Sequence, residues 1–506
     1  MRQLWLLILV VCAGLQGQAS AQTFNERYDP WGRADFGWSI ETLSDSSYIV
    51  FSNSAFQDSL FYSSVLTGVR LNEMGEVLDT TRLSYPLRAT YAGWANASDQ
   101  RSAGGFVVGG NTYQADETIQ AAIFATGPDG HISILMEYGD PGEEWIGRQV
   151  KQTPDGGYVL CGETSTVGFL DAFVLKTDPI GTVQWVKTYG GPYTDRATSV
   201  AMDPAIGGYF AGGKYRETGS NDQLWVQSMN DTGAVLWSKI WGGEFDEFQA
   251  HITTLEDGHI LVASNWGTAV GNSVMYLAKL DRVDGSVIWS STYGEQCQGC
   301  VLLVGQEVWP SGDLIATGIT LVSGGSYFGS LLRTTSEGDS LWMRNYQYFD
   351  DSISNGRGLF YDVQPTHDGG FIAVGVALSV AGNYGQDLWV VKTDSMGCIV
   401  PGCHLVTGVG TQITNLKDVL RVWPNPAASG GSIQLEINLP EGFIAQGALR
   451  LTVVNSLGQV VHEQPIAPHA GQVSLSFAGR WGSAGLYHLH LSDATRWIGG
   501  TELVVE

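Results

Sequence analysis

Short runs of β-branched and aromatic residues, separated by turn residues, follow one another along most of the chain. Residues 148–191 contain four such runs, at 148–153, 158–161, 172–176 and 183–187. Runs of this length and composition are typical of strands and are too short for helices. The second run follows Asp155-Gly156-Gly157, and Asp178 and Gly181 lie between the last two runs, so both are placed for tight turns. The pattern predicts a four-stranded antiparallel sheet.

This pattern repeats roughly every 50 to 60 residues. The residue that opens the second run of each repeat gives one series: Tyr48, Phe106, Tyr158, Tyr209, Ile260, Leu314 and Phe371. The glycine of the last hairpin gives a second series: Gly75, Gly130, Gly181, Gly233, Gly285, Gly338 and Gly397. Both series count seven. Because a small sheet cannot bury both faces alone, stacked copies around an axis are expected, which predicts a seven-bladed β-propeller.

Four tryptophans recur at one position of the repeat, four residues after the glycine: Trp185, Trp237, Trp289 and Trp342. A regular series of aromatic side chains can form a binding stripe or can fill the space between neighbouring sheets. Interfaces between repeats need large apolar side chains in equivalent places, so we expect these residues to pack between blades.

The two ends of the repeat region are incomplete in complementary ways. Phe24 to Tyr28 resembles a fourth strand with no first three strands before it, whereas the seventh repeat turns into a Cys398 to Cys403 loop without a fourth strand. Pairing of the first segment with the last repeat would close the ring and remove exposed sheet edges. Residues 22–403 are therefore predicted to form one closed propeller.

Beyond the repeats, residues 404–418 read as a Thr/Gly-rich linker and residues 419–506 as a second all-β unit. About seven short apolar runs in this segment match the number and size of strands in an immunoglobulin-like β-sandwich. The predicted fold class is all-β, with a seven-bladed β-propeller followed by a small sandwich.

The first 21 residues have the pattern of a secretory signal peptide. Arg2 precedes the apolar stretch 4–11, and Ala19-Ser20-Ala21 supplies a small-residue cleavage site before Gln22. Cys12 raises the alternative of a lipoprotein, but Val11 is larger than the residue such a site prefers. No later run is apolar for the 18 or more residues that a transmembrane helix needs. The sequence thus predicts export and no transmembrane segment.

Five of the six cysteines follow the signal. Cys398 and Cys403 flank a short Pro-Gly loop and are predicted to form a disulfide in an oxidising compartment. Cys297 and Cys300 form a C-x-x-C pair, for which a loop disulfide is preferred over a redox centre or half of a zinc site, because no second pair or nearby histidine completes a metal set. Cys161 is expected to be a buried free thiol.

The net charge of the chain limits the kinds of partner that it can bind. Acidic residues outnumber basic ones by 51 to 26, and the resulting net charge of −25 argues against nucleic acid as a partner. Four acids precede the expected innermost strands: Asp35, Glu144, Asp195 and Glu247. At a channel mouth they could attract a cation or a basic ligand, and the alternative is that they are solvated loop acids.

Catalytic signatures are missing from the sequence. There is no G-x-S-x-G, H-E-x-x-H or phosphate-loop motif, so we predict no catalytic residues and no cofactor. His488 and His490 share one face of a strand but have no third ligand in the sequence pattern, so no metal site is predicted. The D-x-x-G turns, such as Asp178 to Gly181, miss the spacing of a sialidase box by one residue, and their acids are expected to cap their own turns.

Two parts of the chain resemble known families. The repeats are similar to the DGGY-type propeller repeats of secreted Bacteroidetes proteins, a resemblance that implies a fold and no activity. The C-terminal segment resembles the sorting domain of type IX secretion substrates through the residues Trp423, Pro424, Asn425, Pro426, Gly458, Gly485 and Tyr487. That resemblance implies the type IX machinery as a partner and a cell-surface or secreted location.

The function that these observations favour is a binding or interaction module presented outside the cell on a rigid propeller. Its ligand would be an extracellular glycan or a protein, held by loops such as 114–120, 216–222 and 322–327. A polysaccharide-acting hydrolase or lyase with its site in the channel is the second hypothesis, and a purely structural surface protein is the third.

Overall fold

The computed structural model describes these parts of the chain: residues 22–58, 61–83, 88–114, 117–127, 131–140, 142–165, 169–217, 221–308, 310–322, 326–349, 357–378, 386–406, 412–416, 418–439, 443–466, 473–478 and 484–506. The predicted signal peptide, residues 1–21, and Gly130 lie outside the described residues. Among the described residues no helix is both long enough and apolar enough to cross a membrane.

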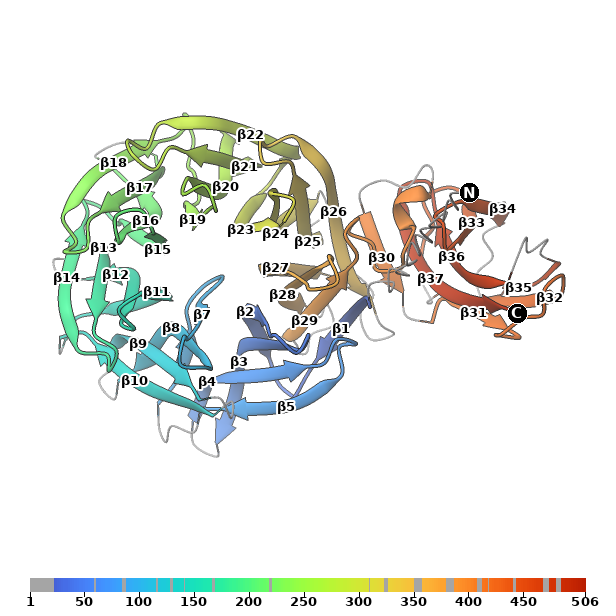
Figure 1. Cartoon of the computed structure of the whole chain (residues 1–506), viewed down its shortest axis with the longest axis horizontal. Helices are drawn as coiled ribbons and strands as arrows, with labels where there is room; N and C mark the ends of the chain where they lie inside the picture. The colour runs from blue at the N-terminus through green and yellow to red at the C-terminus, as the bar shows by residue number, and fades with distance from the viewer. Residues whose placement is uncertain are drawn as a thin grey trace, which may run out of the picture.

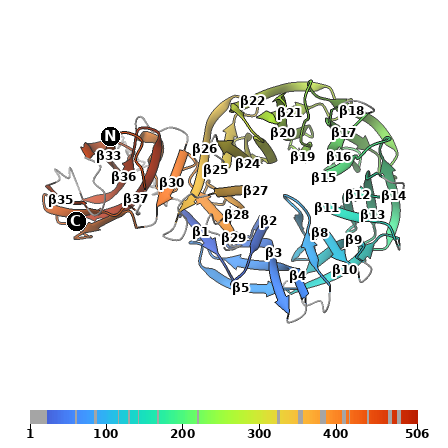
Figure 2. The same cartoon turned by 180° about the vertical axis from the view of Figure 1, so that it is seen from behind.

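Six separate antiparallel sheets, A to F, lie around a central axis as the blades of a β-propeller (Figures 1 and 2). Sheet A has the order β1 (Phe24–Tyr28), β29 (Gln386–Thr393), β28 (Phe371–Leu378) and β27 (Arg357–Pro365). Sheet B contains β2 (Asp35–Thr42), β3 (Tyr48–Asp58), β4 (Phe61–Leu71) and β5 (Val77–Arg82). Sheet C contains β6 (Thr90–Ala92), β7 (Ser98–Gln100), β8 (Phe106–Tyr113), β9 (Ile119–Thr126) and β10 (Ile132–Tyr138).

Sheets D, E and F repeat the same four-stranded meander from the axis outward. Sheet D contains β11 (Trp145–Gln152), β12 (Tyr158–Thr164), β13 (Asp171–Thr177) and β14 (Val183–Tyr189). Sheet E contains β15 (Arg196–Asp203), β16 (Gly208–Tyr215), β17 (Gln223–Met229) and β18 (Val235–Trp241). Sheet F contains β19 (His251–Thr254), β20 (Ile260–Ala269), β21 (Asn272–Leu280) and β22 (Val287–Cys297).

The remaining strands form sheets G and H. Sheet G is mixed and nine-stranded, in the order β23 (Val301–Val308), β24 (Asp313–Val322), β25 (Ser326–Thr334), β26 (Ser340–Phe349), β30 (Gln412–Leu416), β37 (Arg496–Val505), β36 (Gly485–Ser492), β33 (Leu449–Asn455) and β34 (Val460–Ile466). Sheet H contains β31 (Leu420–Trp423), β32 (Ser432–Ile437) and β35 (Val473–Ala478). A short 3-10 helix, η1 (Cys403–Leu405), precedes β30.

The blades are held together by apolar side chains at their faces. Between sheets C and D, for example, Val107 and Ile123 pack in one buried cluster with Tyr158, Leu160 and Phe173. The two middle strands of sheet D are buried along their whole length, which explains why their residues form continuous apolar runs instead of alternating ones. Stacking therefore buries both faces of each central strand pair.

The recurrent tryptophans lie between blades, as predicted. The Trp185 ring of sheet D makes an edge-to-face contact with the Tyr209 ring of sheet E, with 5.7 Å between the ring centroids. The Trp185 Nε1 atom donates a hydrogen bond to the Asp231 carbonyl at 3.0 Å. Gly233 of the facing hairpin has a φ of 76°, and a Cβ there would lie 2.9 Å from the Trp185 ring. The glycine is thus required both by the turn and by the tryptophan of the neighbouring blade.

The acids of the outer hairpins cap their own turns, which confirms a second expectation. Asp178 Oδ1 accepts hydrogen bonds from the backbone N–H groups of Ile180 at 3.0 Å and Thr182 at 2.8 Å. The carboxylate replaces partners that the turn itself cannot supply. These acids have a structural role in the hairpin.

The N-terminal strand closes the ring. β1 pairs antiparallel with β29, with Phe24 opposite Lys392 and Tyr28 opposite Leu388. Phe24 also joins a buried cluster with Ile40 of sheet B and Val390 of sheet A. The predicted pairing of Phe24 to Tyr28 with the last repeat is confirmed.

The prediction of a seven-bladed propeller is confirmed only in part, because the number of separate blades is six. Six sheets are separate, whereas strands β23 to β26, which carry the Leu314 repeat, belong to the larger sheet G (Figure 1). β26 does not end its sheet because β30 pairs with it in parallel, from Asn345 opposite Gln412 to Phe349 opposite Leu416. The outermost strand of a blade has a free edge, and here a strand of the C-terminal region covers it.

The same pairing places a strand within the predicted linker. Residues 404–418 were expected to be a linker, yet they contain β30, which also pairs in parallel with β37. Ile413 of β30 is 1% exposed and packs in one cluster with Trp342 and Trp389 of the ring. Sheet H packs on the C-terminal part of sheet G around a shared core that includes Leu435, Leu451 and Leu489.

Candidate functional site

The innermost strands of five sheets carry a β-bulge near the same end of the strand. Pairing with the next strand skips one residue in β2, β11, β15, β23 and β27, and the skipped residues are Trp38, Arg148, Thr198, Leu303 and Tyr361. A bulge redirects the side chain of the extra residue, and bulges are common beside functional sites. The sequence pattern did not predict these residues, because a single inserted residue does not disturb the repeat.

Aromatic rings from three different sheets meet near the axis. The Trp38 ring lies 4.5 Å from the Tyr361 ring and 6.4 Å from the Trp94 ring, between centroids. Trp94 comes from the segment between β6 and β7, which reaches toward the axis (Figure 1). On its other side Trp94 contacts Phe248 edge-on at 5.7 Å, next to sheet F. We call Trp38, Trp94, Phe248 and Tyr361 the channel aromatics.

Two arginines beside the channel aromatics share one buried acid. Glu163 is 0% exposed and pairs with Arg148 through Oε1 and with Arg196 through Oε2, the latter at 2.5 Å. The Arg148 guanidinium lies over the Trp94 ring, 5.8 Å from its centroid. The charged groups at this point of the channel therefore hold one another and the tryptophan in position.

Hydrogen bonds from side chain to backbone join three pairs of neighbouring innermost strands. Side chains of one strand accept from backbone N–H groups of the next: Asp362 from Ile40 at 2.9 Å, Gln149 from Val200 at 2.7 Å and Ser199 from Ile252 at 2.9 Å. Asp362 is fully buried, and this burial raises its pKa to about 7. The channel wall is thus a connected and rigid frame for the residues above it.

A cavity of about 430 Å³ opens beside Phe248 between sheets E and F. Its lining includes Phe245, Phe248, Asn221, Asn265 and Asn272. Asn221 and Asp222 come from the predicted variable loop 216–222, of which residues 218–220 lie outside the described residues. Ligand pockets of this size typically combine a few aromatic surfaces with placed polar groups.

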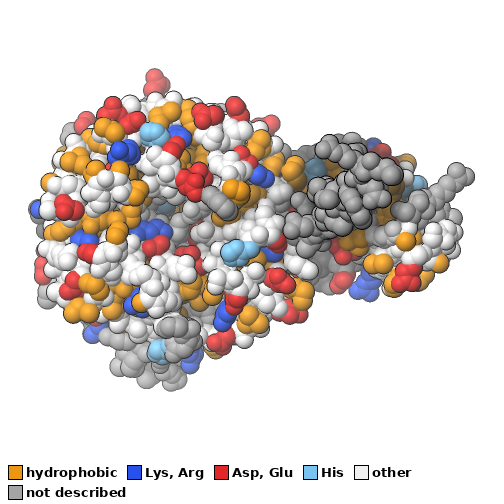
Figure 3. Space-filling view, viewed as in Figure 1, with side chains coloured by type: hydrophobic (Ala, Val, Ile, Leu, Met, Phe, Trp, Pro, Cys, Tyr) orange, Lys and Arg blue, Asp and Glu red, His pale blue; other side chains and the backbone are white. Residues whose placement is uncertain are grey.

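The charges around the cavity are mostly paired. Lys214 Nζ lies 2.6 Å from Asp222 Oδ2, and Arg196 pairs with Glu163 as described. Glu247 and Asp246 add negative charge to the lining. Figure 3 shows acidic and hydrophobic side chains interspersed over this face of the ring, with fewer basic ones. An anionic ligand is therefore disfavoured here, whereas a neutral or basic one is not.

The four acids predicted at the channel mouth have different environments. Asp195 and Glu247 are each 1% exposed, while Glu144 is exposed at the start of β11. Asp195 accepts from the backbone N–H groups of Gly191 at 2.6 Å and Arg216 at 2.8 Å, and Glu247 accepts from Gly243 at 2.8 Å. Burial raises the pKa of Asp195, and it raises that of Glu247 to about 7.

The four acids do not form one cluster. Each lies at its own blade junction, and Asp195 and Glu247 fix the loop that enters the innermost strand. Only Glu247 lines the cavity. The fourth acid, Asp35, is 0% exposed and lies with Asp29 and Asp387 at the ring closure. Binding of a cation or basic ligand by the four predicted acids stays a prediction.

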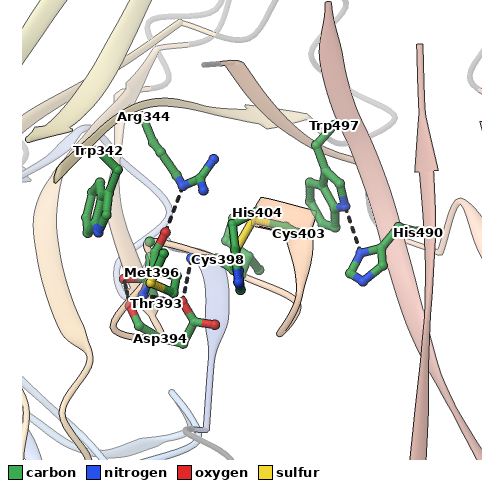
Figure 4. Close-up of a disulfide and its surroundings, with 12 residues drawn as sticks. Trp342, Arg344, Thr393, Asp394, Met396, Cys398, Cys403, His404, His490 and Trp497 are labelled. Atoms are coloured by element: carbon green, nitrogen blue, oxygen red, sulfur yellow. Dashed lines mark hydrogen bonds between the residues drawn. A yellow bond between two sulfur atoms is a disulfide. The ribbon is translucent and has the colours of Figure 1, made fainter. Parts of the chain in front are cut away.

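Both predicted disulfides are present. Cys297 pairs with Cys300 and Cys398 with Cys403, each with Cα atoms 5.5 Å apart, and Cys161 is a buried free thiol. The second disulfide lies where the ring meets the C-terminal sheets (Figure 4). Beside it, Trp497 Nε1 donates to His490 Nδ1 at 3.1 Å, and burial lowers the pKa of His490 to about 3. The histidine is a packed core residue there.

The residues of the predicted sorting motif lie in or beside the C-terminal sandwich. Asn425 joins the motif to the last strand, because its Nδ2 donates to the Glu502 carbonyl at 2.9 Å and its Oδ1 accepts from Val504 N–H at 2.9 Å. Trp423 is 44% exposed at the end of β31, with Pro424 and Pro426 following. Gly458 forms the β33–β34 turn with a φ of 74°.

Two further motif residues belong to β36. Gly485 opens this strand, and Tyr487 is 3% exposed in the sandwich core. The motif therefore spans both sheets of the sandwich. Its residues have a structural role there, whether or not a partner protein binds them.

Comparison with known proteins identifies only remote likenesses. No family model and no curated protein matches this sequence. Among solved structures, Sqt1 from Chaetomium thermophilum is 12% identical with a TM-score of 0.40 and covers 72% of this chain and 87% of its own. Drosophila Semaphorin 2a is 8% identical with a TM-score of 0.38 and covers 96% and 98%. These values carry no argument about activity or partners.

Proposed function

We propose that this protein is an exported β-propeller that binds a neutral extracellular carbohydrate between the channel aromatics and the adjoining cavity. The observation that carries the proposal is the position of Phe248, which lines the cavity and contacts Trp94 of the channel aromatics. One ligand could therefore stack on aromatic rings and meet the polar groups of the cavity at the same time. The site combines sheets A, B and C, which carry the channel aromatics, with sheets E and F, which border the cavity, so it requires the closed ring.

The chemistry of the lining supports a neutral sugar over other ligands. Aromatic rings offer flat apolar surfaces, and an amide side chain such as that of Asn272 can both donate and accept hydrogen bonds. Each of the nearby cations Arg148, Arg196 and Lys214 pairs with Glu163 or Asp222, and the lining adds the acids Asp246 and Glu247. No cation is therefore left without an acidic neighbour to favour a phosphate or a carboxylate. A net charge of −25 acts in the same direction.

We further propose that strands β23 to β26 serve as the seventh blade of the propeller. Their support is the packing on both sides: Leu302 and Leu332 share a buried cluster with Leu261 of sheet F, and Tyr346 shares one with Phe360 of sheet A. In this interpretation residues 22–403 are the propeller and β30 attaches the C-terminal region to it.

Residues 419–506 are proposed to act as a type IX sorting domain, with export to the cell surface or the medium. The proposal depends on the sequence resemblance and on the placement of its motif, in which Asn425 ties the opening segment to the last strand. Deletion of this segment should leave the propeller inside the cell envelope, and fractionation of the producing cells would detect this. Appearance of the deleted form at the surface would contradict the proposal.

A polysaccharide-cleaving activity is the second candidate. Glu247 lines the cavity with a pKa raised to about 7, chiefly by burial, and Asp246 lies next to it in the chain. A carboxyl group with a raised pKa close to a second carboxyl group is the arrangement that glycoside hydrolysis uses. Both carboxylates of Glu247 and Asp246 also make hydrogen bonds to backbone N–H groups, which favours binding as the principal proposal.

The test is a glycan array followed by titration calorimetry with the best neutral oligosaccharide. Phe248→Ala should weaken binding at least about tenfold, since a stacked ring is lost from the centre of the site. Phe169→Ala is the matched control, because Phe169 is 53% exposed and does not line the cavity. Equal binding by both variants, or no neutral glycan bound by the parent, would contradict the proposal. Release of shorter products by the parent would favour the enzyme.

A further inference from the structure

Three carboxylates meet at the point where the ring closes. Asp29 follows β1, Asp35 opens β2 and Asp387 lies in β29, and each places an oxygen within 4.8 Å of the other two. They come from the closing strand, from sheet B and from sheet A. The cluster is thus built only when the two ends of the propeller region are joined.

Asp35 is the most informative member of this cluster. Its side chain is 0% exposed, and its Oδ1 atom accepts from the Ser54 hydroxyl. Its Oδ2 atom is buried and has no hydrogen-bond partner. A buried carboxylate oxygen without a partner is unfavourable, and it points to a group that the protein binds there.

Nearby positive charge does not balance the cluster. Arg27 Nε lies 3.2 Å from Asp387 Oδ2, and the Arg33 backbone N–H donates to Asp29 Oδ1 at 2.9 Å. Among the ion pairs of the described residues, Arg27 with Asp387 is the one that reaches this cluster of three carboxylates. Burial, with further contributions from Asp29 and Asp387, raises the pKa of Asp35 to about 7.

The repeat shows that the third acid is an addition. In sheet D, Tyr189 pairs with Ala172, the residue after Asp171, just as Tyr28 pairs with Leu388, the residue after Asp387. Gly190 therefore occupies the place of Asp29. A Cβ on Gly190 would lie 2.4 Å from Asp171 Oδ1 and 3.0 Å from Asp195 Oδ2, so this place faces both acids of its junction.

The partners of the central acid also differ between the two junctions. At the sheet D–E junction both oxygens of Asp195 accept backbone hydrogen bonds, from Gly191 and Arg216. At the closing junction Asp35 keeps one oxygen without a partner. The ordinary junction satisfies its central acid by protein groups alone, whereas the closing junction has one acid more and fewer donors for its central carboxylate.

We propose that Asp29, Asp35 and Asp387 bind a calcium ion that joins the closing strand to sheets A and B. The ligand set consists of oxygen atoms only, which is the preference of hard cations, and no histidine or cysteine belongs to it. Oxygens on opposite sides of a calcium ion are about 5 Å apart, since each bond is about 2.3 to 2.6 Å. The carboxylates already lie within that span, and water and backbone oxygens would complete the coordination.

The test uses the purified protein after treatment with EDTA, titrated with CaCl2 alone by calorimetry and followed by thermal unfolding. The parent should bind one calcium ion and show a higher Tm with calcium. Asp29→Asn should weaken calcium binding at least about tenfold, because one charged ligand is lost. Asp29 is exposed, so the variant is expected to fold, and Asp35→Asn should act in the same direction.

Asp171→Asn is the matched control, since Asp171 occupies the place of Asp387 at the sheet D–E junction. It should keep the affinity and the Tm increase of the parent. Calcium at about 10 mM exceeds the Kd of weak extracellular sites, so it should saturate this one. The proposal is overturned if the parent gains no stability at that concentration. It is also overturned if Asp29→Asn retains the parent's affinity or if Asp171→Asn loses it. Magnesium in place of calcium should give a smaller increase, and an equal one would contradict the choice of ion.

Discussion

Trp389 donates its indole N–H to the Oδ1 atom of Asn25, 2.5 Å away, although the two residues are 364 positions apart in the chain. Both side chains are buried, and Asn25 Nδ2 also donates to the Gln347 carbonyl at 3.2 Å. One amide side chain of the closing strand thus satisfies groups of sheet A and of sheet G.

Removal of this amide should weaken the closure of the ring and lower the stability of the protein. Asn25→Ala is expected to lower the free energy of unfolding by about 1 to 3 kcal/mol, because the Trp389 N–H is left buried without a partner. Urea unfolding measures the change. In a Trp389→Phe background, where the donor is absent, the same substitution should cost clearly less, and an equal cost in both backgrounds would show that the bond does not matter.

The acid that holds two arginines beside the channel should be more sensitive than a surface acid. Glu163→Gln leaves Arg148 and Arg196 without their buried counter-charge, and the expected loss is about 3 to 5 kcal/mol. Glu463→Gln is the control, since Glu463 pairs with Arg450 at an exposed site and should cost no more than about 1 kcal/mol. Chemical denaturation of both variants makes the comparison, which fails if their losses are alike.

Asp362 should make the fold less stable as the pH rises. Burial raises its pKa in the folded protein from 3.8 to about 7, so the folded state holds a proton that the unfolded state releases. Stability from this group is present below about pH 4 and is lost as the pH rises to about 7. Asp362→Asn keeps an acceptor for the Ile40 N–H without titrating, so its stability should fall less between pH 4 and pH 7.

A control separates this effect from the titration of other groups. Asp140→Asn, at an exposed loop residue, should leave the pH profile of stability as in the parent. The explanation is wrong if Asp362→Asn and the parent lose the same stability over this interval.

The disulfide at the junction of ring and sandwich should stabilise the region where they meet. Cys398→Ser with Cys403→Ser removes a crosslink across a short loop, for which a loss of about 2 kcal/mol is expected. Differential scanning calorimetry with and without reductant measures it. In a background in which serines replace Cys297 and Cys300, reductant should lower the Tm of the protein that keeps Cys398 and Cys403. It should leave the Tm of the variant without either disulfide unchanged, and an unchanged Tm of both proteins would contradict the stabilising role.

The repeat predicted what depends on periodic packing. Strand pattern, hairpin glycines such as Gly233, the tryptophans between blades and the pairing of Phe24 to Tyr28 with β29 all follow from apolar runs and turn residues that every blade needs. The parallel pairing of β30 with β26 did not follow, since residues 404–418 are few, polar and unlike any repeat. A strand that covers an existing edge needs little sequence signal of its own.

The candidate site was less predictable for a related reason. Trp38, Arg148 and Tyr361 are the extra residues of bulges, and a bulge depends on local pairing that no spacing reveals. The acids Asp35, Asp195 and Glu247 were found from their equivalent positions, but their burial and backbone partners were not. Position within the repeat identified them, whereas their separation at different junctions required the folded ring.

We expect the channel aromatics and the cavity beside them to form one ligand site. Hydrogen–deuterium exchange of the protein with a bound neutral oligosaccharide measures whether both parts contact the ligand. Exchange at residues 93–97 and at residues 245–249 should slow together when the ligand is added, because these segments carry Trp94 and Phe248. Slower exchange confined to the C-terminal sandwich, or to only one of the two segments, would contradict the account.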